Sequence, residues 1–408
     1  MLLLQGPVGP FFATVAAGLR RVGAAEVHKI NFNGGDWLFY PRGATPFRGN
    51  HNDWAAFFEQ YVTRHRIDAV IAFGDCRPVH RAAFKATAAR GISAWAFEEG
   101  YVRPNYVTFE EHGVNGFSLL PTAPAFYAGL PPVEPEQERE VGSTFSATAR
   151  WAMQYYVAAA LLRPWFSPNL HHRPLRLSES LPWVRGFWRK HRYRAAEKGL
   201  LPQLQTVDSN RYFIVPLQVG TDSQVHTHSG FDSVTDFLRR VVESFAAEAP
   251  DDLKLVVKHH PLDRGYHDYT ELLRTLAEQH GLHERLLYVH DLHLPTLLEH
   301  ARGAIVINST VGLSALHHGT PVIALGKAIY HMPGLTFQGS LDEFWHEAPA
   351  YPPDRTLFWK FRHYVIARTQ LLGSFYKPLP GHPTTGPLDS ERPHDAALPQ
   401  ASLLAGQE

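Results

Sequence analysis

Two neighbouring carboxyl groups stand where an apolar stretch ends. The segment FEEG places Glu98 and Glu99 side by side, followed by a glycine and the segment YVRP with Arg103. Adjacent carboxyls in a cleft tend to raise the pKa of one of them, which suits a general acid or base near neutral pH. A solvated pair of surface acids is the alternative interpretation. The glycine and YVRP favour a shaped turn.

A second polar segment, KHHP, follows the apolar stretch LKLVV. His260 can donate a hydrogen bond to a phosphate, and Lys258 adds positive charge nearby. Pro261 restricts the backbone of His260 and biases it away from the α region. An ordinary turn with an exposed histidine is the alternative.

Two more segments carry polar residues at the ends of apolar stretches. In NSTVG, Ser309 and Thr310 can cap the helix that follows, bind phosphate at its N-terminus, or do both. In PLQVGTDSQ, Gln218, Asp222 and Gln224 follow an apolar stretch. Asp222 can act as a nucleophile toward an anomeric carbon, or it can form a turn.

The N-terminal segment QGPVGPFF contains Gln5, Gly6 and Gly9. It has the position of a phosphate loop but not the glycine spacing of one. It therefore either lets a substrate approach the backbone closely or makes a tight turn. The segment GDCRP adds Asp75 and Arg77, and such an arginine can bind a carboxylate or phosphate.

The elements around these segments predict two α/β domains. Apolar strands alternate with helical patterns, which is typical of parallel sheets with ligand sites at the carboxyl ends of the strands. The fold class is therefore α/β, with two facing Rossmann-like domains and a central cleft. Strands are expected at 2–5, 27–32, 69–73, 93–97, 212–217, 253–258, 286–289, 304–307 and 321–325. Helices are expected at 11–21, 53–65, 79–90, 234–247, 267–280, 294–301 and 312–318. The expected domains are 1–130 (acceptor side), 131–205 (membrane-proximal helical insertion), 206–345 (donor side), 346–375 (helices returning to the first domain) and 376–408 (disordered tail).

Composition restricts the environment and the partners. The 39 basic and 39 acidic residues cancel, so no global field draws the chain to nucleic acid. Cys76 is the single cysteine, which fits a reducing compartment. The sequence starts without a signal-peptide pattern, and no apolar run reaches the roughly 20 residues of a membrane span. We expect a cytoplasmic protein.

The segment 150–198 differs from its surroundings. It holds ten Arg or Lys residues against two Glu, interleaved with nine aromatic residues. Clustered cations and aromatic side chains favour the surface of an anionic membrane. A solvated basic linker with core aromatics is one alternative, and a site for single-stranded RNA is another, although nothing else in the chain supports RNA binding.

In this order, an acidic pair, an HP segment and a Ser-Thr pair look like those of bacterial transferases that use CMP-activated acidic sugars. More closely, LLLQGPVGPFF, NFNGGD, FGDCRPVHR, FEEGYVRPNYVTFE, PLQVGTDSQ, KHHPLDRGY and NSTVGLSALHHGTPVIALGKAIY resemble the KpsS (LipB-like) family of capsule polysaccharide biosynthesis proteins. The resemblance implies a GT-B fold and a Kdo transferase. Such an enzyme takes Kdo from CMP-Kdo and adds the first β-linked residue to a lyso-phosphatidylglycerol acceptor.

The resemblance also implies roles for particular residues. Glu99 or Glu98 would be the acid or base, and Asp222 would be the nucleophile of a retaining double displacement, with a single displacement as the competing mechanism. His260, Ser309 and Thr310 would hold the donor phosphate. No metal or other cofactor is expected, because CMP is already a good leaving group. The expected partners are the CMP-sugar, a phospholipid, the anionic inner face of the inner membrane and other capsule assembly proteins. The alternatives are a transferase or epimerase that uses a UDP-sugar, and a non-catalytic protein of capsule assembly or export.

Overall fold

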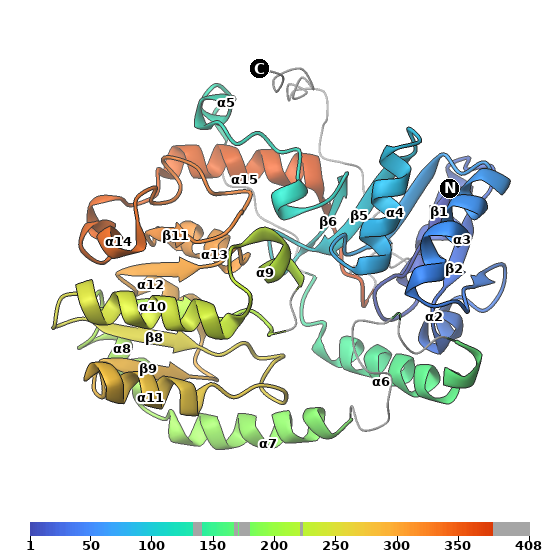
Figure 1. The fold of residues 1–408 in the computed structure, drawn as a ribbon. Coiled ribbons are helices and arrows are strands. Elements are labelled where there is room, and N and C mark those ends of the chain that lie inside the picture. The colour runs from blue at the N-terminus through green and yellow to red at the C-terminus, as the bar shows by residue number, and fades with distance from the viewer. Residues whose placement is uncertain (134–140, 167–169, 171–179, 221–222, 378–408) are drawn as a thin grey trace. The chain divides into compact units, whose positions relative to one another are not determined.

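The structure, a computed structural model, describes residues 1–133, 141–166, 170, 180–220 and 223–377 of the 408. The chain divides into two compact α/β units, each with its own sheet (Figure 1). The first unit contains Met1–Leu119, Pro135–Glu179 and Tyr364–Glu408, and the second contains Leu120–Glu134 and Ser180–His363. The predicted α/β class with two Rossmann-like units is confirmed, and the GT-B-like arrangement stays a prediction. That the units face one another across a cleft stays a prediction.

The first unit is built on a seven-stranded sheet in the order β12-β6-β5-β4-β1-β2-β3. Its strands are β1 (Leu2–Leu3), β2 (His28–Asn31), β3 (Thr45–Pro46), β4 (Ala69–Phe73), β5 (Ser93–Glu99), β6 (Tyr106–Glu111) and β12 (Gln370–Leu372). Its helices are α1 (Phe11–Arg21), α2 (Gly34–Phe39), α3 (His51–Arg64), α4 (Pro78–Ala88) and α6 (Phe145–Leu161). The run from β5 to β3 is parallel, whereas β6 and β12 pair antiparallel.

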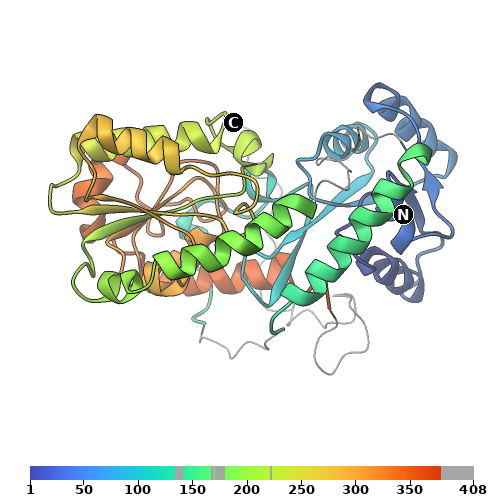
Figure 2. The same cartoon turned by 90° about the horizontal axis from the view of Figure 1, so that it is seen from below.

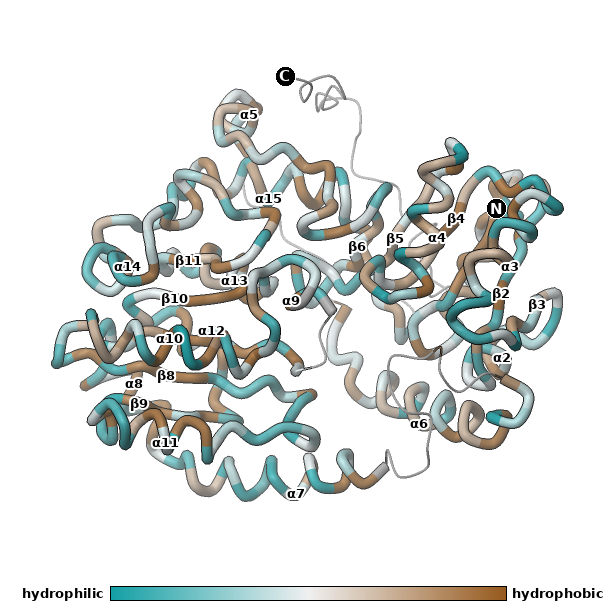
Figure 3. The backbone as a smooth tube through the Cα atoms, viewed as in Figure 1, coloured by the Kyte–Doolittle hydropathy of each residue, from teal (hydrophilic) through white to brown (hydrophobic). Residues whose placement is uncertain are grey.

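Both faces of this sheet are covered, which explains why its strands are apolar without alternation. Leu2 and Val70 pack with α3 and α4 in one buried cluster. Leu3 and Ile71, their neighbours along the chain, point to the opposite face and pack with α1 in another cluster. Figure 3 shows hydrophobic residues concentrated in the strands.

The second unit is built on five parallel strands in the order β11-β10-β7-β8-β9. They are β7 (Tyr212–Pro216), β8 (Lys254–Lys258), β9 (Leu286–Val289), β10 (Gly303–Val306) and β11 (Val322–Ala324). The helices are α5 (Pro124–Ala128), α7 (Ser180–Ala196), α8 (Leu200–Gln205), α9 (Ser223–His228), α10 (Val234–Glu248), α11 (Thr270–His280), α12 (Leu294–Glu299), α13 (Val311–His318) and α14 (Leu341–Glu347). One face of the sheet packs with α10, α11 and α14 in a single buried cluster.

The structure corrects the end of the strand that carries the acidic pair. The apolar run stops at Phe97, so the sequence predicts a turn at Glu98 and Glu99. Instead, β5 continues through both residues, because β6 pairs antiparallel with it up to Glu99, opposite Val107. Backbone hydrogen bonds to a partner strand extend β5 beyond the point where hydrophobicity ends.

The domain boundaries also differ from those predicted. Residues 120–134 belong to the second unit, and 131–205 is not one insertion, because α6 packs with the first unit and α7 with the second. α15 (Arg355–Thr369) begins in the second unit and ends in the first, where β12 joins the sheet. Tyr376 is not part of a disordered tail, since its carbonyl accepts a hydrogen bond from Trp151. Residues 378–408 lie outside the described residues.

α6 overlaps the beginning of the basic and aromatic segment 150–198. Neither it nor any other helix within the described residues is long and apolar enough to cross a bilayer.

Candidate active site

The first sheet changes direction between β1 and β4, and the expected polar residues gather there. From β1 the chain proceeds to β2 and β3 on one side, and then to β4 and β5 on the other. Ligands of open α/β sheets bind outside the carboxyl ends of the strands at such a point. Gln5 follows β1 and Arg77 follows β4, and the Arg77 Nη1 donates to Gln5 Oε1 at 2.7 Å. The structure therefore brings these two predicted residues together.

A tyrosine that the sequence did not single out completes this group. Tyr155 of α6 accepts hydrogen bonds from Asn33 (2.7 Å) and Gln5 (3.2 Å) and donates to Asp36 at 2.9 Å. A Cβ on Gly35 would lie 2.5 Å from the Tyr155 ring, so the glycine lets α2 approach α6. This contact explains the glycine and the acid of the segment NFNGGD.

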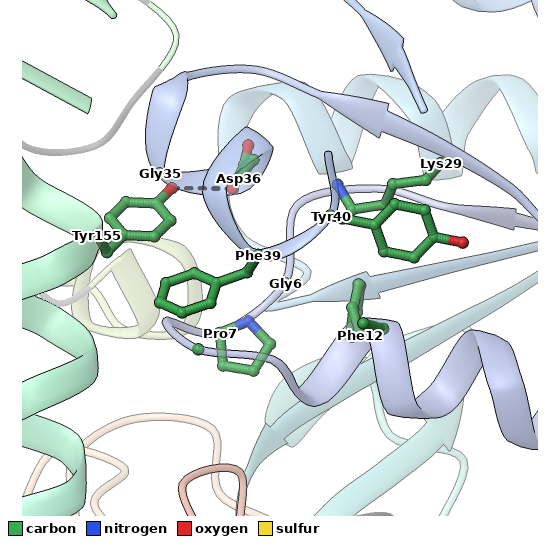
Figure 4. Close-up of a pocket in the computed structure, with 11 residues that line it drawn as sticks. Gly6, Pro7, Phe12, Lys29, Gly35, Asp36, Phe39, Tyr40 and Tyr155 are labelled. Carbon is green, nitrogen blue, oxygen red and sulfur yellow. Dashed lines mark hydrogen bonds between the residues drawn. The ribbon is translucent and has the colours of Figure 1, made fainter. Parts of the chain in front are cut away.

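A small pocket opens beside this network (Figure 4). Gly6 and Gly9, both predicted, line it together with Lys29, Asp36 and Tyr155. The remaining lining residues are Pro7, Phe12, Ala13, Gly35, Phe39 and Tyr40. Burial lowers the pKa of Lys29 to about 8, although Asp36 opposes the shift. The pocket therefore combines apolar walls with a buried cation and a buried carboxylate.

Removing the Tyr155 hydroxyl should destabilise the first unit. In Tyr155→Phe, Asp36 loses a donor and Asn33 an acceptor within the interior, so the free energy of unfolding should fall by about 1–3 kcal/mol. Urea unfolding measures this change. Tyr351→Phe, at a tyrosine that is 54% exposed, is the control and should be neutral. Equal unfolding midpoints for Tyr155→Phe and the wild type would contradict a stabilising role.

Glu98 has the electrostatic properties expected of a proton-transfer group. Burial raises the pKa of its carboxyl to about 7, with smaller contributions from Asp75 and Glu99. Its Oε1 accepts from the backbone N–H of Glu99 at 3.0 Å. The side chain of Glu99 instead accepts a hydrogen bond from the Tyr376 hydroxyl at 3.0 Å. The two acids thus have different hydrogen-bond partners.

The other predicted residues of the first unit have structural contacts. Asp75 is buried and accepts from the backbone N–H of Val114 at 2.8 Å. Arg103 is exposed, and its Nε donates to the Gly100 carbonyl. A further acid, Glu110, accepts from the hydroxyl of Tyr101 at 2.6 Å, and burial raises its pKa to about 7. Glu110 lies on β6 and is buried, which the sequence pattern gave no means of recognising.

The order in which the chain adds strands to the second sheet reverses between β7 and β10. Residues predicted to bind the sugar donor lie on both sides of that point. From β7 the chain proceeds to β8 and β9, and then returns to β10 next to β7. Gln218 follows β7 and donates to Asn308, which follows β10, at 3.0 Å. Asn308 donates in turn to the backbone carbonyl of Gln224 at 3.0 Å. These bonds join the loops that surround the expected ligand position.

His260 lies just after β8, with one ring nitrogen held by its own turn. It follows β8 in a half-buried position, and its Nδ1 accepts from the backbone N–H of Leu262 at 3.2 Å. In the neutral ring the proton is then on Nε2, where it can be donated to an anion. Pro261 is exposed beside it. By contrast, His259 is buried and its Nδ1 lies 2.6 Å from the Tyr288 hydroxyl.

Lys258 has a different environment from the one its predicted role suggests. The side chain is buried, and its ammonium donates to the His290 carbonyl at 2.7 Å. Burial lowers the pKa of Lys258 to about 8. Lys258 joins the loops that follow β8 and β9. Because its ammonium is buried, its charge can influence the site only from inside the protein.

Ser309 and Thr310 lie where α13 begins, after β10. Ser309 Oγ accepts from the backbone N–H of Val311, whereas the side chain of Thr310, the N-cap residue, makes no capping bond. The Tyr330 hydroxyl donates to the Ser309 carbonyl. Tyr330 lies against Gly312, where a Cβ would be only 2.2 Å from its oxygen. This close approach fixes the turn that presents the helix N-terminus.

A methyl group at Gly312 should disrupt this turn. Glycine to alanine within a helix ordinarily stabilises, but here the methyl collides with buried Tyr330. We expect Gly312→Ala to lower the free energy of unfolding by about 1–3 kcal/mol. Chemical denaturation measures the change. Gly230→Ala is the matched control, since a Cβ there meets nothing within 4 Å. An unchanged or increased stability of Gly312→Ala would show that the turn adjusts freely.

Asp222, the predicted nucleophile, lies outside the described residues. Nearby, the backbone N–H of Gly220 donates to Asp263 at 3.1 Å. This bond joins the loop after β7 to the loop that contains His260.

Two α/β units, each with polar side chains at the switch point of a largely parallel sheet, define a ligand-binding protein of the doubly wound class. The chain belongs to the family described as "Capsule polysaccharide biosynthesis protein", whose sequence profile matches residues 68–376. The predicted family membership is confirmed.

Two relatives and one solved structure illustrate the similarity. The chain is 41% identical to "Capsule polysaccharide export protein KpsS" of Escherichia coli, over 92% of this chain and 96% of the relative. It is also 41% identical to "Capsule polysaccharide modification protein LipB" of Neisseria meningitidis serogroup A, over 92% of this chain and 91% of the relative. The structure of "Thermosulfurimonas dismutans KpsC, beta Kdo 2,7 transferase" aligns with a TM-score of 0.41 and 12% identity, covering 91% of this chain and 92% of that chain.

Proposed function

We propose that this protein is a glycosyltransferase that moves Kdo from CMP-Kdo to a lyso-phosphatidylglycerol-type lipid, starting the linker of a capsular polysaccharide. The observation that carries the proposal is Glu98. Its carboxyl stands at the carboxyl end of β5, with a pKa of about 7, where a general base for an acceptor hydroxyl is most effective. Membership of a capsule biosynthesis family and the resemblance to KpsS and LipB support a role in capsule polysaccharide assembly.

On the donor side, the second unit offers groups suited to a leaving phosphate. His260 has a proton on Nε2 for a phosphate oxygen, and the N-terminus of α13 provides backbone donors and a positive dipole end beside Ser309. These groups stabilise the negative charge that develops on CMP as its bond to the sugar breaks. Donor binding is thus assigned to the second unit.

On the acceptor side, the first unit offers a pocket beneath an apolar helix. The inner face of α6 carries Tyr155 into the pocket wall. Its outer face exposes apolar side chains at intervals of four and eight residues, namely Phe145 (71%), Met153 (67%), Val157 (43%) and Leu161 (66%). An exposed apolar stripe of this kind is typical of contact with lipid. A phospholipid acceptor at the anionic inner face of the inner membrane fits this arrangement.

The reaction proceeds with retained configuration in the proposed mechanism. Asp222 attacks C2 of Kdo and forms a covalent ester as the bond to the CMP oxygen breaks. An acceptor hydroxyl then attacks C2, the ester bond breaks and Asp222 is restored as a carboxylate, while Glu98 takes the hydroxyl proton. Direct displacement by the acceptor, without the ester, is the competing mechanism and inverts the configuration. The anomeric configuration of the product distinguishes the two.

The proposed reaction requires no divalent metal. CMP is a good leaving group, and the developing charge has the protein donors described above. Activity should therefore be unchanged in excess EDTA. A loss of activity in EDTA that magnesium restores would contradict this prediction.

The decisive experiment combines the purified protein with CMP-Kdo and a lyso-phosphatidylglycerol. Mass spectrometry should detect the acceptor increased in mass by one Kdo residue. Reactions in which UDP-sugars replace CMP-Kdo are the control for the alternative donor class. Nucleotide release from a UDP-sugar and not from CMP-Kdo would overturn the proposal. A non-catalytic role in assembly or export predicts that Glu98→Gln and His260→Ala restore capsule formation to a deletion strain, whereas the transferase predicts that both fail.

A further inference from the structure

Helix α7 has two faces of opposite character. The inner face packs on the second unit through Pro182, Gly186, Arg189 and Tyr193, which recur at helical spacing. A Cβ on Gly265 would lie 2.0 Å from the Pro182 carbonyl oxygen, so helix and loop are in backbone contact. The ring of Tyr193 stacks on His290 with centroids 3.6 Å apart.

The inner face holds the loop that follows β8. Arg185 Nε donates to the Gly265 carbonyl at 2.7 Å, and Arg189 Nη1 donates to the Arg264 carbonyl at 2.9 Å. Arg189 also pairs with Asp268 at 2.9 Å. The loop begins at His260, so α7 braces the segment that carries the proposed phosphate donor.

The same face holds the loop that follows β9. Glu197, just beyond the helix, accepts from the backbone N–H groups of His290 (2.6 Å) and Asp291 (2.9 Å). Arg194 pairs with Asp291 at 3.0 Å. Lys258, the last residue of β8, donates to the His290 carbonyl, and this bond connects the two braced loops. A displacement of α7 would therefore move the loops at the carboxyl ends of both β8 and β9.

The outer face is apolar, although no described part of the second unit covers it. Its exposed residues are Leu181 (67%), Val184 (57%), Phe187 (62%) and Trp188 (71%). Three cations near the C-terminal end of the helix are also exposed, namely Lys190, Arg192 and Lys198. Figure 2 shows α7, in bright green, on the outside of the second unit, and hydrophobic residues colour its first half in Figure 3. An apolar stripe accompanied by cations is complementary to a lipid surface of negative charge.

We infer that the outer face of α7 binds an anionic phospholipid bilayer, and that this contact strengthens donor binding through the loop that the inner face holds. The inference rests on the proposed function for the identity of the donor. A bilayer that orders α7 orders the loop containing His260, so less ordering remains to oppose the binding of the nucleotide. By linkage, bound nucleotide must increase affinity for the bilayer by the same factor.

The test measures CMP binding by the full chain with and without vesicles. Vesicles of phosphatidylcholine with about 30 mol% phosphatidylglycerol should lower the Kd of CMP by about fivefold or more, and vesicles of phosphatidylcholine alone should not. Flotation of the vesicles measures membrane binding in the same samples. The variant Phe187→Ser/Trp188→Ser should float less than the wild type, with α6 unchanged, and should lose the vesicle effect, while its Kd for CMP without vesicles stays that of the wild type.

Two further variants separate the surface from the coupling. Arg185→Gln removes the bond to Gly265 but leaves the outer face, so it should float with vesicles yet lose most of the vesicle effect on CMP. Val207→Ser, which changes a side chain that is 73% exposed elsewhere in the second unit, is the matched control and should behave as the wild type. Unchanged flotation of the Phe187→Ser/Trp188→Ser variant overturns the assigned surface, as does wild-type protein that fails to float.

The outcome for CMP distinguishes this inference from the proposed function. CMP binding that vesicles do not alter overturns the coupling and leaves the proposed function standing. An absence of CMP binding under both conditions overturns the coupling together with the proposed donor.

Discussion

Replacing Glu98 with glutamine is expected to lower kcat by about 10²–10³-fold, within the range found for removal of a general base. Glutamine keeps the size of the side chain and can still accept the hydrogen bond from the Glu99 backbone, but it cannot take a proton. In the wild type, kcat/KM should rise as the pH rises through about 7, because the base must be ionised. The residual activity of Glu98→Gln should lack this rise. Initial rates of CMP release across the pH range measure both effects.

The matched control for this prediction is Glu110→Gln. Burial raises the pKa of Glu110 to about 7 as well, but its carboxylate is occupied by Tyr101 and Ser118. Glu110→Gln should therefore keep the wild-type pH profile. If it loses the profile while Glu98→Gln retains it, the assignment of the base is wrong. Glu99→Gln tests the neighbouring acid, and a larger loss there than at Glu98 would exchange their roles.

The raised pKa of Glu98 also predicts that Glu98→Gln gains stability while it loses activity. The carboxyl has an ordinary pKa of 4.5 and a pKa of about 7 in the folded protein. Between these values the folded state binds more protons than the unfolded state, so stability falls as the pH rises through this interval. Above pH 7, Glu98→Gln removes the cost of a buried charge and should raise the thermal midpoint while activity is lost. A variant that loses both activity and stability would indicate a structural role instead.

Replacing His260 with alanine is expected to weaken CMP binding by about 10- to 100-fold, the range for a lost hydrogen bond to a charged group. The ring is half-buried, and its Nδ1 accepts a hydrogen bond from a backbone N–H. In the proposed site, its Nε2 donates to the phosphate. Because the ring is not part of the core, the unfolding midpoint should change little. Calorimetric titration with CMP and thermal unfolding measure the two quantities.

The neighbouring histidines provide the controls for this variant. His259→Ala removes a buried ring that lies against the Tyr288 hydroxyl, so it should lower stability. His283→Ala removes an exposed ring elsewhere in the second unit and should alter neither quantity. Equal CMP affinity in His260→Ala and the wild type would remove His260 from the donor site.

The sequence determined the parts of this protein that depend on local pattern. Apolar stretches alternating with helices specified two α/β units, since burial on both faces makes parallel strands apolar throughout. Carboxyl ends of such strands meet at one edge, so Gln5 and Arg77 could be expected together, and likewise Gln218 and the segment containing Ser309. These expectations hold because chain direction alone decides on which edge a loop lies.

Tertiary structure alone decided which side chains have unusual properties. Tyr155 contacts Asp36 across 119 positions, and Tyr376 contacts Glu99 across 277, separations that no local pattern encodes. The raised pKa of Glu98 arises from burial, and the two faces of α7 arise from which of its residues the second unit covers. A pKa and an exposed surface depend on the atoms that surround a group, and those atoms come from distant parts of the chain.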